Sequence, residues 1–274
     1  GKLNTLVKDN AGRNRKVLEL FCRFGADSSI FYEQKPHVGT DRLISIVTAM
    51  REEILRLGGE VRFSSRAADF CVEADKLSAV LVERADGTRY ELKTEVLIAA
   101  TGHSARDTFR VLASRGFSME AKAFAVGFRV QHRQRDISLS QYGEREADFL
   151  PPAPYKLAAK TSVGRGVYSF CMCPGGYVVN ASSEVGGTVV NGMSYADRGS
   201  ENANAAIIVS VTPEDFQRYG TGALAGLAFQ EELEKRAFLA GQGKIPVQLY
   251  GDFLSGRESQ SFGGIQPCFA GQYR

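Results

Sequence analysis

A short apolar run, Val96–Ala100 (VLIAA), constrains this chain more than any other stretch of its sequence. Apolar and polar residues do not alternate in it, a pattern typical of a strand buried on both faces of a parallel sheet. Thr101-Gly102 ends the run, and Ser104 to Asp107 has the spacing of a capping box that opens a helix. The stretch therefore predicts a strand, a glycine turn and a helix N-terminus at the carboxyl edge of a sheet.

A unit of this kind places backbone N–H groups where α/β proteins bind phosphate-bearing cofactors. His103 follows the turn and could donate a hydrogen bond to a cofactor oxygen. Many α/β proteins carry the same unit for structural reasons alone, and a histidine in a surface turn is an equally good interpretation. The flanking patterns are needed to choose between these interpretations.

The patterns before the run predict a helix, a strand and a hairpin. Apolar residues recur at helical spacing from residue 43 to 57, after the N-cap candidate Thr40. A strand is expected from residue 61, and strands 77–83 and 89–92 flank an Asp-Gly turn. A hairpin inserted between two strands of a parallel sheet is the β-meander crossover of two-dinucleotide-fold flavoproteins. Nearer the N-terminus, we expect a short helix at 17–21 and a brief strand at 30–32.

After Gly116 the chain changes character and predicts a mixed sheet. Residues 124–130 alternate like a half-buried strand, and four further strands are expected at 167–173, 177–182, 188–193 and 206–211. A capped turn at Thr212 and a helix at 224–240 follow. We therefore expect two domains: residues 1–120, a partial FAD- or NAD(P)-binding type, and residues 121–274, a substrate or cap domain.

Composition excludes several classes of protein. The net charge of +3 comes from 34 basic and 31 acidic residues without a basic stripe, which argues against a nucleic-acid binder. No apolar run reaches membrane-spanning length, and the N-terminus has no charged-then-apolar signal pattern. Five cysteines are too few for a disulfide framework and favour the cytoplasm, and no zinc-ligand spacing occurs, so we expect no metal. The chain starts without Met and ends in loop-like residues, from which we expect an interior fragment of a longer protein.

Two constellations could carry chemistry. Cys171 and Cys173 precede Pro-Gly-Gly and could place a thiol beside a reacting group, or they could be small buried hydrophobes before a turn. Arg42, at the start of the predicted helix, could pair with a phosphate or be a solvated first-turn side chain. We expect Arg129 and His132, near the end of a strand, to be a solvated pair.

Four strings resemble a known family: residues 1–7 (GKLNTLV), 37–43 (HVGTDRL), 98–107 (IAATGHSARD) and 168–179 (YSFCMCPGGYVV). They are similar to the uncharacterised FAD-dependent dehydrogenases of bacteria, which are labelled NAD(P)/FAD-dependent oxidoreductases. The resemblance implies a glutathione-reductase-like FAD domain interrupted by a substrate domain. It also implies an N-terminal glycine-rich strand for the FAD pyrophosphate, which this chain does not contain.

The resemblance assigns cofactor contacts residue by residue. It implies that Arg42 lies near the FAD phosphates or ribityl chain and that the backbone of Ala67 meets the adenine. Ala100, Thr101 and Gly102 match a turn that passes close to the cofactor, and His103 follows them.

The same resemblance implies the residues nearest the chemistry. Lys2 would approach the flavin ring, and Cys173 would belong to the strand of the substrate domain nearest the site; these two are the catalytic candidates. Gly175 and Gly176 would form a substrate-side loop.

We therefore expect a flavin-dependent oxidoreductase that passes hydride between flavin and a small molecule, with a reduced nicotinamide nucleotide as one source of hydride. Two alternatives stay open. One is a non-catalytic module that binds a ligand or partner with the sheet of residues 121–260. The other is a flavin-dependent reductase of an isoprenoid or unsaturated lipid.

Overall fold

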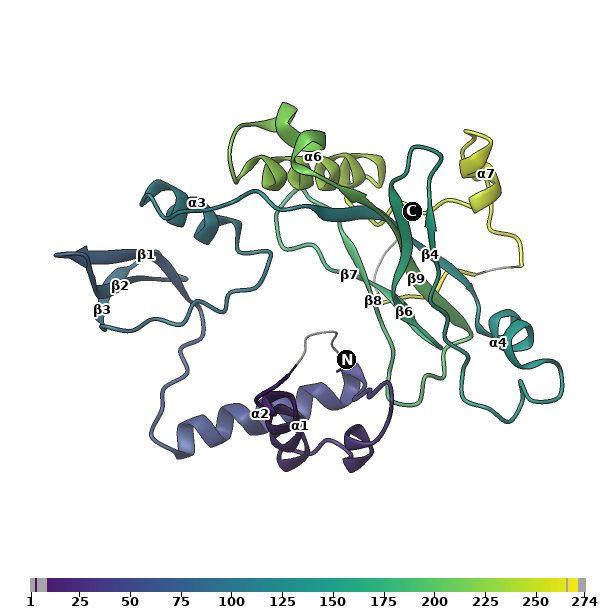
Figure 1. Ribbon diagram of the computed structural model, residues 1–274, viewed down its shortest axis with the longest axis horizontal. Helices are drawn as coiled ribbons and strands as arrows, with labels where there is room; N and C mark the ends of the chain where they lie inside the picture. Colours follow the sequence, from purple (N-terminus) through teal and green to yellow (C-terminus); the bar gives the residue numbers. More distant parts are fainter. Residues whose placement is uncertain (1–2, 4–8, 265, 271–274) are drawn as a thin grey trace. The chain divides into compact units, whose positions relative to one another are not determined.

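The computed structural model describes residues 3, 9–264 and 266–270, which form two compact units. Unit 1 comprises Gly1–Leu57, Phe124–Val211 and Leu233–Arg274, and unit 2 comprises Gly58–Ala123 and Thr212–Glu232. The expected division into residues 1–120 and 121–274 stays a prediction. Figure 1 shows the elements of both units.

The chain contains both helices and strands. The helices are α1 (Arg13–Arg23), α2 (Thr40–Arg56), α3 (Arg106–Ser114), α4 (Gln134–Tyr142), α5 (Pro213–Phe216), α6 (Ala225–Ala240) and α7 (Tyr250–Leu254), with 3-10 turns η1 (Ser28–Phe31) and η2 (Gln217–Tyr219). The strands are β1 (Ser65–Glu73), β2 (Lys76–Arg84), β3 (Arg89–Lys93), β4 (Phe124–Arg133), β5 (Ala158–Lys160), β6 (Gly166–Cys173), β7 (Tyr177–Asn180), β8 (Val190–Met193), β9 (Asn202–Val211) and β10 (Phe269–Ala270). Among the described residues, no helix combines the length and the apolar character needed to cross a bilayer.

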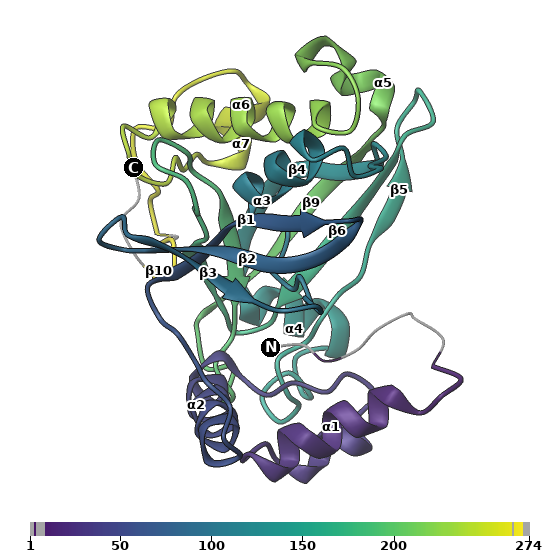
Figure 2. The same cartoon turned by 90° about the vertical axis from the view of Figure 1, so that its left-hand side faces the viewer.

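Unit 2 contains the predicted hairpin. Strands β1, β2 and β3 form an antiparallel meander, and the Asp-Gly turn joins β2 to β3 as expected (Figure 2). Phe70, Val80 and Val82 are buried where Val111 and Leu112 of α3 pack against them. The apolar stripe of α3 therefore covers one face of the meander.

The predicted buried strand at Val96–Ala100 is wrong. These residues form no strand and are exposed, Val96 by 76% and Ile98 by 86%. No strand among the described residues pairs with them. An apolar run without a neighbouring strand has nothing against which to bury either face. Two smaller expectations are also wrong: the strand begins at Ser65 rather than 61, and residues 30–31 belong to η1.

The parallel sheet expected within residues 1–120 is wrong, because β1, β2 and β3 are antiparallel, and the sheets of unit 1 are antiparallel except for one short pair. One has the order β4-β9-β6-β5 and is antiparallel throughout. The other has the order β10-β7-β8, in which β10 runs parallel to β7 and β8 antiparallel to it. The single parallel pairing among the described strands therefore spans two residues of β10. The fold class is mixed α/β with antiparallel sheets.

The N-terminal helices of unit 1 attach to the loop that follows β8. Ile30, Val38 and Ile46 form a buried cluster under α1 and α2. Thr40 donates its backbone N–H to the carbonyl oxygen of Ser194 at 3.2 Å. The predicted helix is present, but its N-cap is Gly39 rather than Thr40, which is the first helical residue. The hydrogen bond to Ser194 holds the start of α2 against a loop about 150 residues later in the chain.

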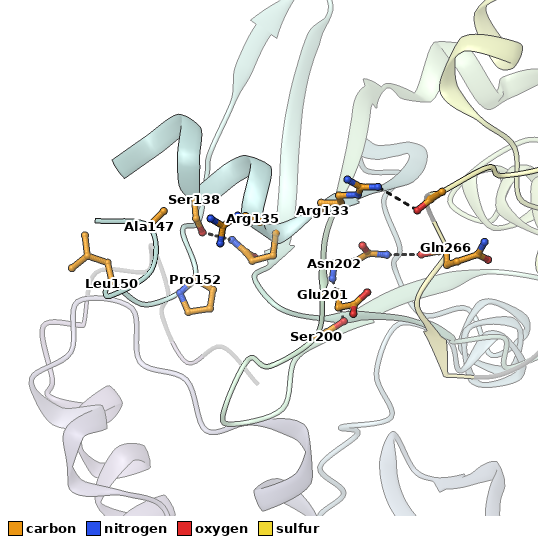
Figure 3. Close-up of a pocket in the computed structure, with 12 residues that line it drawn as sticks. Arg133, Arg135, Ser138, Ala147, Leu150, Pro152, Ser200, Glu201, Asn202 and Gln266 are labelled. Atoms are coloured by element: carbon orange, nitrogen blue, oxygen red, sulfur yellow. Dashed lines mark hydrogen bonds between the residues drawn. The ribbon is translucent and has the colours of Figure 1, made fainter. Parts of the chain in front are cut away.

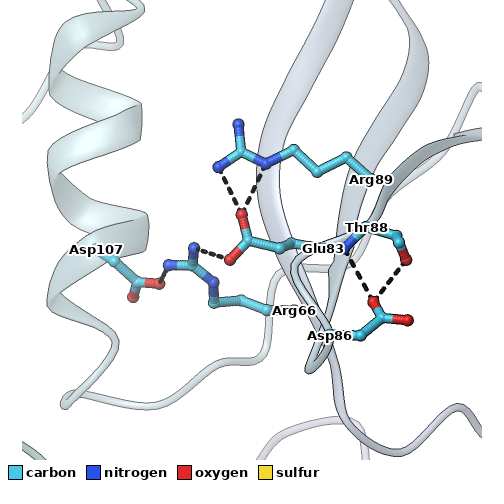
Figure 4. Close-up of polar contacts among 6 residues, drawn as sticks. All are labelled: Arg66, Glu83, Asp86, Thr88, Arg89 and Asp107. Atoms are coloured by element: carbon cyan, nitrogen blue, oxygen red, sulfur yellow. Dashed lines mark hydrogen bonds and ion pairs between the residues drawn. The ribbon is translucent and has the colours of Figure 1, made fainter.

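A chain of ion pairs joins α3 to the meander of unit 2 (Figure 4). Arg66 donates to Asp107 on α3 and to Glu83 on β2, each at 2.8 Å, and Arg89 also donates to Glu83. Hydrogen bonds from these guanidinium groups hold the pKa of Glu83 and the pKa of Asp107 below their usual values. The two carboxylates stabilise unit 2 while they are ionised.

We expect Arg66→Gln to lower the melting temperature at neutral pH and to have less effect in acid. Because the folded pKa values are depressed, the contribution of the carboxylates is present above their ordinary values of 4.5 for Glu and 3.8 for Asp and is lost as the pH falls further. Thermal unfolding followed from neutral pH to about pH 3 measures this loss. Lys93→Gln on β3 is the control with the same change of charge, and equal pH profiles for both variants would contradict the prediction.

Candidate functional site

The Pro-Gly-Gly loop after β6 is packed too closely for any side chain at its glycines. Gly175 has φ +48°, and a Cβ there would lie 1.6 Å from the carbonyl oxygen of Arg198. A Cβ on Gly176 would lie 2.4 Å from the carbonyl oxygen of Met193. Both glycines are buried. They are therefore required where the backbone of this loop meets the backbone of residues 193–198.

The peptide groups of the same loop are bound by other parts of unit 1. The N–H of Gly175 donates to Gln134 Oε1 at 2.8 Å, and the N–H of Gly176 donates to the carbonyl oxygen of Asn202 at 2.8 Å. The Ser194 hydroxyl donates to the carbonyl oxygen of Pro174 at 2.9 Å. These contacts give the loop a structural role, and its contact with a substrate stays a prediction.

Gln134, the first residue of α4, connects three segments with one buried side chain. Its Nε2 donates to Ser138 Oγ at 3.2 Å and to the carbonyl oxygen of Ala153 at 3.1 Å, while its Oε1 accepts from Gly175. The start of α4, the proline-rich loop and the Pro-Gly-Gly loop are thereby held together. No sequence pattern singled out Gln134, because a glutamine at a strand–helix junction carries no motif.

Cys173 is buried, 3% exposed, and its thiol donates to the carbonyl oxygen of Cys171 at 3.3 Å. Cys171 has φ +48° at the point where the β6–β9 register shifts, as in a β-bulge. This position favours the interpretation of Cys173 as a packed side chain. A catalytic role for its thiol stays a prediction and would require access for a reactant.

Arg129 of β4 is part of a polar cluster, which corrects its expected solvation. Its guanidinium donates to Asn204 Oδ1 at 2.6 Å, to Asn191 Oδ1 at 3.3 Å and to the carbonyl oxygen of Cys171 at 3.5 Å. Arg129 Nε and Asn204 Nδ2 are buried, and no described residue accepts a hydrogen bond from them. Gly192 lies against both side chains, since a Cβ there would be 2.3 Å from each. The sequence could not predict this cluster, because the alternation of apolar and polar residues along β4 does not reveal which residues cover each face of the strand.

His132 also has a protein partner. Its Nε2 and the Tyr155 hydroxyl are 2.8 Å apart, and the rings meet edge to face. Burial raises the pKa of Tyr155, and the positive charge of Arg129 opposes that rise. The tyrosine therefore stays protonated at neutral pH.

Arg42 borders a cavity of about 410 Å³ within unit 1. Asp41, Tyr195, Ala196 and Asp197 complete its lining. Asp41 accepts a hydrogen bond from the N–H of Ala196 at 2.9 Å, which holds the start of α2 against this loop. The guanidinium of Arg42 is exposed at the positive end of the helix dipole, a suitable position for an oxygen-rich group.

The other predicted cofactor residues belong to unit 2. Ala67 lies on β1 and is exposed, as are Ala100, Thr101, Gly102 and His103. Among the described residues, none accepts a hydrogen bond from the backbone N–H of 100–102. The turn thus offers donors to solvent or to a ligand. His103 Nε2 lies 3.3 Å from the Ser104 hydroxyl.

Lys2 lies outside the described residues, so the structure carries no information about it. Within the part of the chain that the structure describes, no group of three or more His, Cys, Asp or Glu side chains could hold a metal ion.

A second cavity, of about 440 Å³, lies at the start of α4 (Figure 3). Ala147, Leu150 and Pro152 form an apolar wall, and Arg133 and Arg135 bring positive charge. The buried polar residues of its lining are Gln134, Ser138, Ser200 and Asn202. Asn202 Nδ2 donates to the carbonyl oxygen of Gln266 at 2.9 Å, and Arg133 donates to that of Gly264 at 3.2 Å.

Comparison with known proteins gives one family match and two similar proteins. The model of the family described as "FAD-dependent protein, C-terminal domain-like" matches residues 123–274. An uncharacterised protein of Clostridium beijerinckii is 45% identical over 277 residues, covering 100% of this chain and 50% of that protein. Tetracenomycin B2 monooxygenase-dioxygenase of Streptomyces olivaceus is 35% identical over 94 residues, covering 33% of this chain and 16% of that protein. The chain thus spans half of the first relative and a smaller part of the second.

We expect Gly175→Ala to lower the free energy of unfolding by about 3 kcal/mol, because a left-handed residue and an overpacked contact each cost about 1–3 kcal/mol. Gly164→Ala is the control: Gly164 also has a positive φ, +82°, but nothing within 4 Å of its Cβ position. The control should lose only about 1 kcal/mol. Chemical denaturation measures both, and equal losses would show that the Arg198 contact is unimportant.

We expect Gln134→Leu to lower the free energy of unfolding by about 2–4 kcal/mol, since it leaves the Gly175 N–H and the Ala153 carbonyl buried without partners. Gln141→Leu, on an exposed position of the same helix, should change it by less than about 0.5 kcal/mol. Urea denaturation followed by circular dichroism distinguishes the two. A similar small change in both variants contradicts the role assigned to Gln134.

Proposed function

The chain belongs to the family described as FAD-dependent protein, C-terminal domain-like, and we propose that the protein containing it is a flavin-dependent oxidoreductase acting on a small molecule. The observation that carries the proposal is the family match over residues 123–274. Because the chain spans half of its C. beijerinckii relative, the activity is proposed for the whole protein rather than for these residues alone.

The exposed donors of this chain fit the polar parts of FAD. Arg42 offers a guanidinium beside a cavity of about 410 Å³, and the turn at 100–102 offers backbone N–H groups that no described residue binds. Phosphate and ribityl oxygens accept from donors of both kinds. Asp41 and Asp197 also line the cavity, and their carboxylates suit hydroxyl groups better than phosphate.

These features define what the chain would contribute. Arg42 would hold the ribityl hydroxyls or a phosphate oxygen. By the resemblance of the sequence, the turn at 100–102 would pass close to the cofactor. The backbone of Ala67 would lie against the adenine. When bound, FAD supplies the two-electron chemistry at its ring system, while the protein positions and tunes it.

The finer parts of the proposal rest on the resemblance of the sequence. Lys2 would approach the flavin ring, Cys173 would act from the substrate side, and a reduced nicotinamide nucleotide would deliver hydride. Gly175 and Gly176 would support this side by fixing the path of the loop.

A monooxygenase is the second candidate. The similarity to tetracenomycin B2 monooxygenase-dioxygenase, over a third of this chain, favours it. The two candidates differ in the fate of the electrons: a dehydrogenase passes them to a carrier, whereas a monooxygenase passes them to oxygen and inserts one oxygen atom into its substrate.

We expect the complete gene product that contains residues 1–274 to purify with the visible absorbance of bound flavin. Arg42→Gln should weaken FAD binding about tenfold or more, because a charge-assisted hydrogen bond is lost. Arg51→Gln, on the same helix but away from the cavity, is the control. Visible absorbance and fluorescence titration with FAD measure the change in FAD affinity. A folded complete protein that takes up no FAD would contradict the proposal.

A further inference from the structure

We propose that the cavity at the start of α4 binds a small organic acid, with its carboxylate against Arg135 and Ser138 and its apolar body against Leu150 (Figure 3). The site lies wholly within unit 1 and is distinct from the cavity beside Arg42. The proposal does not depend on flavin binding.

The cavity has the size and the two-sided lining of a small-molecule site. Its volume of about 440 Å³ falls within the range of about 300–1,000 Å³ that such sites span. Ala147, Leu150 and Pro152 supply an apolar wall, while α4 and the start of β9 supply polar groups. A ligand that fills it must therefore combine an apolar body with a polar end.

Protein groups accept hydrogen bonds from only some of the N–H donors of Arg133 and Arg135. Arg133 donates one hydrogen bond to the carbonyl oxygen of Gly264, and Arg135 forms an ion pair with the Asp148 carboxylate at 2.8 Å through one of its N–H groups. A guanidinium has five N–H donors in a planar fork that matches a carboxylate. Among the described residues that line the cavity, Glu201 is the single carboxylate, and neither arginine forms an ion pair with it.

Ser138 adds a buried donor. Its side chain is 5% exposed, and its hydroxyl oxygen accepts from Gln134 Nε2 at 3.2 Å and from the N–H of Ala153 at 3.3 Å. Both lone pairs are thus occupied, so the hydroxyl hydrogen is left to donate. No described residue accepts it, whereas an oxygen atom of a ligand in the cavity can.

Glu201 restricts the charge of the ligand. Its carboxylate would repel a dianion such as a phosphate monoester more strongly than a carboxylate, which carries one charge. The apolar wall likewise favours an organic acid over an inorganic anion. A monocarboxylate with a compact apolar body satisfies both conditions.

Phenylacetate is a suitable probe, with phenylacetamide as its uncharged counterpart of the same shape. We expect saturation-transfer NMR on the intact chain to detect phenylacetate and to give a weaker signal or none for phenylacetamide. Arg135→Gln should raise the Kd for phenylacetate about tenfold, and Arg133→Gln, whose guanidinium points towards Gly264 (Figure 3), should raise it less. Glu201→Gln should lower the Kd, because it removes a like charge.

Two controls separate binding from general effects. Arg145→Gln makes the same change of charge at an exposed position that does not line the cavity, and its Kd should equal that of the wild type. Ser138→Ala tests the buried donor without changing charge and should raise the Kd severalfold, with folding checked by circular dichroism. The proposal would be overturned if phenylacetamide bound as tightly as phenylacetate, or if the folded chain did not bind phenylacetate. It would also be overturned if Arg145→Gln lowered the affinity for phenylacetate as much as Arg135→Gln.

Discussion

The buried amide of Gln134 is the interaction on which the described part of unit 1 most depends. One side chain satisfies the N–H of Gly175, the carbonyl oxygen of Ala153 and the hydroxyl of Ser138. Each of these groups belongs to a different segment, and the Gly175 N–H and the Ala153 carbonyl oxygen would be buried without a partner if the amide were absent. The same amide therefore fixes the Pro-Gly-Gly loop and one wall of the cavity at α4. The fold of this region and the shape of the candidate site thus depend on the same side chain.

Local patterns predicted the elements that depend on neighbours in sequence. The helix of α2, the hairpin of β2 and β3 around its Asp-Gly turn, and the strands β4, β6 and β9 are confirmed, because periodicity and turn residues determine them. The capping box at Thr212 is also present at the start of α5. The membership in an FAD-dependent family, inferred from short strings, is confirmed by the match over residues 123–274.

Features that depend on distant partners could not be predicted. The run Val96–Ala100 has the composition of a buried strand, but burial requires a neighbour, and none of the described strands pairs with it. Arg129 looked solvated because the asparagines that accept its hydrogen bonds, Asn191 and Asn204, come 62 and 75 residues later. The cavity at α4 draws its walls from four separate stretches, and no local spacing records such an arrangement. The roles predicted for Lys2, Ala67 and Cys173 stay predictions.

The exposed run at Val96–Ile98 has a consequence for how the chain behaves in concentrated solution. Three consecutive β-branched or leucine side chains are exposed there without a charge or proline among them. The Thr94 hydroxyl binds the backbone of Val96, whereas no described residue forms a backbone hydrogen bond with Leu97 or Ile98, so the backbone of these two residues can pair with another extended segment. An identical run on a second molecule is the best-matched partner for such an edge, since like side chains interdigitate when strands stack in register. The stretch that most resembles a core strand is thus also the point from which self-association of the chain would begin.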